Sequence, residues 1–112
     1  MDAPTPLQRV AFSGWCMKTV SAANRRWREE HPGKGDYLMS RERLHFRIFQ
    51  WLIKSGRIED PGPRMTQSFA SYAALAYSAD PQAVVNEARR YYRELVAKAL
   101  NPGVETEKAG RS

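Results

Sequence analysis

The sequence contains a single cysteine, Cys16, and no apolar run long enough to cross a membrane. A lone cysteine excludes a disulfide within the chain, and a reducing cytoplasm is then the simplest location. A membrane-spanning helix needs about 18 or more consecutive apolar residues. Residues 1–6 carry an acid and two prolines, and they lack the basic start and apolar stretch of a secretory signal. We therefore expect a cytoplasmic protein with no membrane segment.

The sequence also lacks the short motifs of common reactions: GxSxG, HExxH, CxxC and the GxxxxGKS/T phosphate loop. Neither His31 nor His45 has a cysteine or histidine at metal-ligand spacing. We expect His45 to be a half-buried surface side chain. Cys16 lies on an apolar face and belongs to the expected core, and a thiol acts as a nucleophile only beside a base and an oxyanion donor. The sequence thus predicts no enzyme, metal site, cofactor or small-molecule substrate.

Positive charge, by contrast, is plentiful. The 112 residues include 18 Lys and Arg against 12 Asp and Glu, which gives a net charge of +6 and a pI near 9.8. Arginine dominates, and its planar guanidinium binds phosphate through two hydrogen bonds where lysine acts as a point charge. A basic excess favours polyanions, above all nucleic acid. A soluble protein that is merely basic has the same composition, so charge alone leaves both readings open.

Apolar residues recur at three- and four-residue steps, which predicts an all-α fold. We expect one compact domain over residues 1–103 with about four helices, followed by a disordered polar tail over 104–112. The helices are predicted at 6–30, 41–55, 66–78 and 81–100. Ser40 and Asp80 are suited to cap the helices that follow them, and Gly56 is suited to end the second helix. Gly14 marks either a close helix contact or a bend.

The stretch SYAALAYSADPQAVVNEARRYY, residues 71–92, carries the main functional signal. Its centre, LAYSADPQAV, resembles helix-turn-helix proteins, in which an alanine-rich helix supports a recognition helix. The connection is about two residues shorter than usual and lacks the customary glycine. Glutamine and asparagine can bridge adenine, and arginine can bridge guanine or phosphate. The resemblance implies that one helical face contacts double-stranded DNA, through Gln82, Asn86, Arg89, Arg90 and Arg93.

The same pattern also fits an ordinary amphipathic helix whose polar residues face water. In that reading Arg90 and Glu94 form a surface pair, as do Glu94 and Lys98. Acidic Asp80 and Glu87 near the face would repel phosphate. A second basic set, NRRWR at 24–28, supplies three candidate phosphate contacts, Arg25, Arg26 and Arg28. Trp27 within it either stacks on a base or closes the end of the core.

Two adjacent tyrosines, Tyr91 and Tyr92, cannot both face one core. We expect one of them to lie at a surface or a partner interface, where tyrosine is favoured. A homodimer formed through the last helix is one such arrangement. The sequence therefore predicts a small DNA-binding regulatory or accessory protein. The alternative is a helical protein-interaction module, such as an adaptor, an inhibitor or an assembly subunit of a phage or plasmid system.

Overall fold

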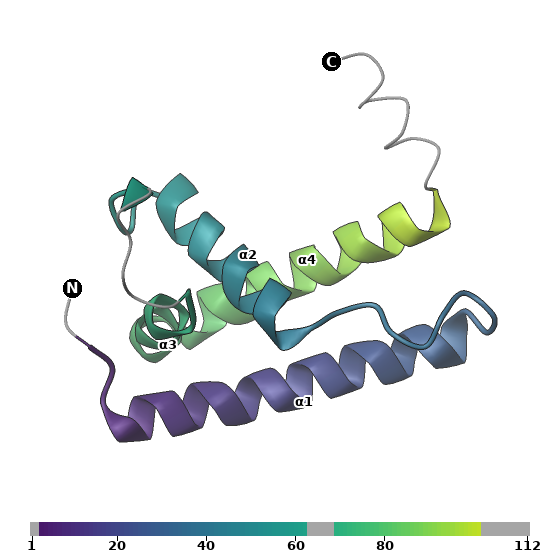
Figure 1. Cartoon of the computed structure of the whole chain (residues 1–112), viewed down its shortest axis with the longest axis horizontal. Helices are drawn as coiled ribbons and strands as arrows, with labels where there is room; N and C mark the ends of the chain where they lie inside the picture. The colour runs from purple at the N-terminus through teal and green to yellow at the C-terminus, as the bar shows by residue number, and fades with distance from the viewer. Residues whose placement is uncertain (1–2, 63–68, 102–112) are drawn as a thin grey trace, which may run out of the picture.

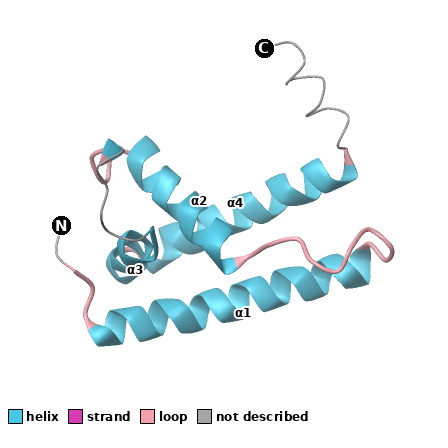
Figure 2. Cartoon of the chain, viewed as in Figure 1, coloured by secondary structure: helices cyan, strands magenta, loops and turns pink. Residues whose placement is uncertain are grey.

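The computed structural model describes residues 3–62 and 69–101, and within these ranges it contains four helices and no strand (Figures 1 and 2). The helices are α1 (Pro6–Glu30), α2 (Arg41–Lys54), α3 (Phe69–Ala79) and α4 (Pro81–Leu100). The predicted all-α class and the predicted helices are confirmed, with bounds that differ by a residue or two. The start predicted for the third helix, at 66–68, and the tail predicted over 104–112 lie outside the described residues.

Local chemistry sets where the helices begin and end. The Ser40 side chain accepts a hydrogen bond from the Arg43 amide at 3.2 Å, which caps α2 as predicted. Gly56 has φ +73°, so it takes the left-handed turn that follows α2. The amides of Arg57 and Ile58 then bond back to the Leu52 carbonyl. The chain thus leaves α2 in a closed turn, and no free carbonyl remains at Leu52.

One buried side chain fixes the loop between α1 and α2. Asn24 on α1 is 9% exposed. Its Oδ1 accepts hydrogen bonds from the amides of Leu38 and Met39, at 2.7 and 2.9 Å, and its Nδ2 donates to the Met39 carbonyl at 3.0 Å. Asn24 therefore replaces the backbone partners that this loop lacks, and it holds the start of α2 against α1.

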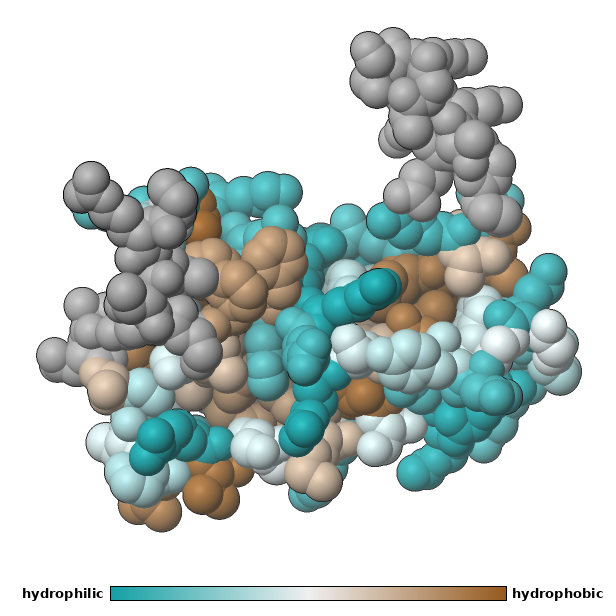
Figure 3. Space-filling model, viewed as in Figure 1, coloured by the Kyte–Doolittle hydropathy of each residue, from teal (hydrophilic) through white to brown (hydrophobic). Residues whose placement is uncertain are grey.

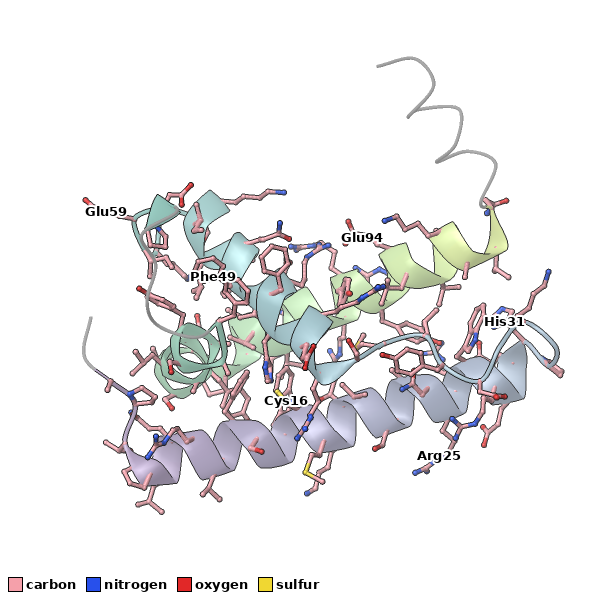
Figure 4. The ribbon with its side chains drawn as sticks, in the orientation of Figure 1. Cys16, Arg25, His31, Phe49, Glu59 and Glu94 are labelled. Carbon is pink, nitrogen blue, oxygen red and sulfur yellow. The ribbon has the colours of Figure 1, made fainter. Side chains whose placement is uncertain are left out.

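The core lies where the four helices meet. It includes Phe12, Cys16, Leu44, Ile48 and Val84, each 2% exposed or less. Cys16 points from α1 into the space between the helices (Figure 4), and burial raises the pKa of its thiol to about 12, against the opposing charge of Arg41. The thiol is therefore protonated and inert at neutral pH, which confirms the core assignment.

The structure decides between alternatives that the sequence left open at two positions. Gly14 is exposed, and a Cβ atom built on it would meet nothing within 4 Å, so it marks no close helix contact. Trp27 is 1% exposed and its ring lies 4.6 Å from that of His31. A tryptophan this buried closes the end of the core and has no face free for a base.

The arrangement of α1 and α4 positions the side chains of the candidate site. In Figure 1 the two helices run side by side in the same direction, α2 crosses them obliquely, and α3 is seen end-on. Helix α1 packs on α3 and α2, and α4 packs on α2 and α3, but α1 and α4 have the least contact with each other of any helix pair. Side chains of both helices line a groove between them.

Candidate nucleic-acid interface

The connection between α3 and α4 is a single residue, Asp80. Its side chain accepts a hydrogen bond from the Ala83 amide at 3.2 Å, and Pro81 occupies the first helical position, as predicted. Helix α3 packs through Ala73 and Ala74, which are 0% and 1% exposed. The pair thus has a supporting helix and a long exposed second helix. Its connection is shorter than the usual turn of three or four residues in helix-turn-helix proteins.

The buried and exposed faces of α4 are the ones that the sequence predicts. Val84 and Ala88 are buried. The predicted outward side chains are all exposed: Gln82, Asn86, Arg89, Arg90 and Arg93. Gln82 Nε2 donates to Asn86 Oδ1 at 2.9 Å, so the two amides form one polar unit in the N-terminal half of the helix. Each amide keeps further donor and acceptor positions for a base edge.

Three of the predicted arginines converge on the groove between α1 and α4. Arg26 comes from α1, and Arg89 and Arg93 come from α4. The groove has a volume of about 570 Å³, and among the described residues no acidic side chain lines it. Neither Arg89 nor Arg93 forms an ion pair with any residue that the structure describes. We call these three side chains the groove arginines. Two of them are uncompensated charges at the edge of the α4 face.

Arg26 is held in place more firmly than its two partners. Its guanidinium lies 5.1 Å from the centre of the Tyr92 ring and pairs with Glu30 one turn further along α1. The Tyr92 hydroxyl is buried at this point and has no hydrogen-bond partner among the described residues. Burial raises the pKa of the Tyr92 phenol despite the nearby charge of Arg26, so the ring is neutral at neutral pH.

Arg90 lies on the other side of α4. It pairs with Glu87, which is 4% exposed, and not with Glu94, the partner that the surface-helix alternative gave it. Glu94 instead pairs with Arg47 of α2, and Arg47 also binds Glu87. Arg90 therefore compensates a buried carboxylate. Glu87 has two cationic partners, so little of its charge remains to repel a phosphate at the exposed face.

The remaining predicted phosphate contacts do not join the groove arginines. Arg25 points from α1 away from the other helices (Figure 4). Arg28 donates to the Asp36 carbonyl at 3.2 Å, near the far end of α1. The structure thus brings together Arg26, Arg89 and Arg93 and separates them from Arg25, Arg28 and Arg90.

The adjacent tyrosines point to opposite sides of α4. Tyr91 lies under Arg47 of α2, with 5.4 Å between guanidinium and ring centre, and Tyr92 lies under Arg26 of α1. Both are half-buried within the chain. The two adjacent rings do not face one core, as expected, because two different helices flank α4 and each contacts one tyrosine.

Sequence reasoning overlooked an apolar stripe on the outer face of α1. Leu7, Val10 and Met17 are 81%, 70% and 56% exposed. They follow helical steps of three and seven, and Gly14 lies between them, so they share one face. Figure 3 shows hydrophobic side chains at the lower left of the molecule, where the N-terminal half of α1 runs. The stripe is difficult to recognise in the sequence, because apolar residues of the inner and outer faces are interspersed along this helix.

No protein family, curated protein or solved structure matches this chain. No helix in the described ranges has the length and apolar character that a membrane crossing requires. Within 3–62 and 69–101, no three His, Cys, Asp or Glu side chains are grouped to hold a metal ion. The candidate site therefore rests on its own geometry.

Proposed function

We propose that this protein binds double-stranded DNA through the exposed face of α4 and acts as a small regulatory or accessory factor. One observation carries the proposal. Gln82 and Asn86 lie on the same exposed face as Arg89 and Arg93, and neither arginine has an acidic partner among the described residues. A recognition helix needs this combination of polar tips, flanking arginines and an apolar back.

The roles of the side chains follow from their chemistry. Arg89, Arg93 and Arg26 would contact phosphates and set the affinity and its salt dependence. Gln82 and Asn86 would reach base edges and set any sequence preference. Arg90 would contribute less than the sequence predicts, because it already neutralises the buried Glu87. Arg25 and Arg28 lie apart from the groove arginines, so they would contact phosphates only on a second stretch of backbone.

Fluorescence anisotropy of a labelled generic duplex at about 50 and 200 mM salt tests the proposal. The logarithm of the binding constant falls by about 0.9 per neutralised phosphate for each tenfold rise in salt. Three phosphate contacts therefore predict a loss of about 40-fold over this range, and six predict about 10³-fold. A salt-steep affinity supports the proposal. Absence of binding at about 50 mM salt contradicts it.

The second candidate function is a protein-interaction module, and the apolar stripe of Leu7, Val10 and Met17 favours it. Contiguous exposed apolar side chains mark contact surfaces more often than isolated ones do. Replacing Val10 and Met17 with glutamine would abolish self-association or complex formation if the stripe is an interface. Sedimentation of the wild type and this variant distinguishes a homodimer from a monomer.

A further inference from the structure

The groove between α1 and α4 has two distinct parts. Its edge carries the groove arginines and the exposed Ala22, and its floor is formed by small or apolar side chains: Ala23, Val85 and Ala88. Trp15 and Tyr92 form part of its walls. Ala88 is 4% exposed, and Ala23 and Val85 are half-buried. The floor is therefore apolar and formed by side chains that are buried or half-buried.

The charged edge of this groove is suited to binding a DNA duplex, whereas its apolar floor is not. Phosphates bind the charged edge, where they also keep contact with water. They gain nothing from the methyl groups of alanine and valine, because an ion loses hydration on entering an apolar surface. Phosphate contacts therefore leave the apolar floor uncovered, and a ligand with an apolar side would cover it.

We propose that the groove binds an acidic amphipathic helix of a partner protein, which covers Arg89 and Arg93 and so competes with nucleic acid. The competition rests on the proposed function, whereas the binding of the helix does not. In effect the partner would regulate access to the exposed face of α4.

Charge and shape both favour this occupant. Arg89 and Arg93 line the groove and form no ion pair with any described residue, so carboxylates on the flanks of the partner helix supply the missing partners. Alanines on the floor let another helix approach closely. The distance between the two helix axes could then be near the lower end of the usual 8–10 Å. Apolar side chains at i, i+3 or i+4, and i+7 of the partner would then enter the groove. The unpaired Tyr92 hydroxyl offers a donor to a carboxylate, given a small shift of its neighbours.

The test uses the full chain and a designed peptide of about 18 residues, which is long enough to form a marginal helix in water. The peptide carries leucines at i, i+3 and i+7 spacing and glutamates on the remaining faces. A peptide of the same composition with shuffled order controls for charge. Ala22→Trp fills the groove from an exposed position, so the fold is retained. The matched control is Ser21→Trp, because Ser21 is exposed on the same helix and does not line the groove.

The designed peptide is expected to bind the wild type and Ser21→Trp equally, and Ala22→Trp at least tenfold more weakly, by anisotropy. It should also displace a labelled duplex from the wild type. Equal binding to Ala22→Trp, equal binding of the shuffled peptide, or no peptide binding overturns the groove proposal. A duplex that stays bound in excess peptide overturns the competition. Peptide binding without any duplex binding supports the groove and contradicts the proposed DNA function, so the two failures are distinguishable.

Discussion

Arg47 of α2 and Glu87 of α4 form an ion pair at 3.0 Å although they lie 40 residues apart. Glu87 is 4% exposed and Arg47 is 22% exposed. Partial burial lowers the pKa of the Arg47 guanidinium, but hydrogen bonds and charge from Glu94 and Glu87 outweigh it and raise the pKa above its ordinary value. The pair therefore remains charged, and it ties the helix that carries the candidate site to the centre of the fold.

Removing the cation should destabilise the fold. Arg47→Met leaves the buried Glu87 with Arg90 as its remaining partner, and breaking a fully buried pair costs about 3–5 kcal/mol. Because Arg47 is partly exposed, we expect a loss of about 2–3 kcal/mol in the free energy of unfolding, measured with urea. Glu94→Gln is the control, since its side chain is 54% exposed and surface pairs contribute about 1 kcal/mol or less. Equal effects of the two substitutions would show that Glu87 needs no counter-ion from α2.

Two glycine substitutions should change stability in opposite directions. Gly14→Ala places a methyl group in open space within α1, and alanine favours a helix interior by about 1 kcal/mol over glycine. Gly56→Ala forces a side chain into φ +73°, which costs about 1–2 kcal/mol. We expect the melting temperature to rise in the first variant and to fall in the second. A fall in both would mean that Gly14 has a packing role after all.

The helices could be predicted because their ends are local. Thr5, Ser40 and Asp80 are caps within three residues of the amides they bind, and the apolar steps run within each helix. The fold class, the exposed face of α4 and the burial of Cys16 all follow from such short-range patterns.

The convergence of arginines could not be predicted in the same way. Whether Arg26 meets Arg89 depends on the crossing of α1 and α4, and Arg25 differs from Arg26 by only one step along its helix. The burial of Glu87 is equally nonlocal, because it requires a cation that α2 supplies. In the sequence Asn24 stands at the start of the basic set NRRWR, whereas its hydrogen bonds reach a loop 14 and 15 residues away. Each of these outcomes is set by packing between helices.

The loop between α1 and α2 should depend on Asn24. Asn24→Leu leaves the Leu38 and Met39 amides without partners, and each unsatisfied buried group costs about 1–3 kcal/mol. We expect a loss of about 2–4 kcal/mol in unfolding free energy and faster hydrogen exchange at both amides. Asn24→Asp keeps the acceptor for the two amides and loses the donor to the Met39 carbonyl, so their protection should persist. Fast exchange in both variants would show that the amides bond elsewhere.

His45 should make stability depend on pH. Burial and, to a lesser extent, the charge of Arg41 lower its pKa below the ordinary 6.5 in the folded chain. The unfolded chain then binds the proton more readily, so the stabilisation is full above about pH 6.5 and is lost as the pH falls through the folded pKa. His45→Gln should flatten the decline in unfolding free energy between about pH 7.5 and 5. An NMR titration in which the folded ring protonates at or above pH 6.5 would contradict this account.

Single-charge variants of α4 separate a specific DNA interface from general electrostatics. Arg89→Ala and Arg93→Ala each remove an uncompensated cation, so each should reduce the slope of log affinity against log salt by about 1. Arg90→Ala removes the same charge from the same helix, but that cation neutralises Glu87, so its slope should change little. Circular dichroism would confirm that each variant is folded before anisotropy is measured. If all three variants lose the same affinity and slope, net charge alone accounts for binding and the proposed face does not.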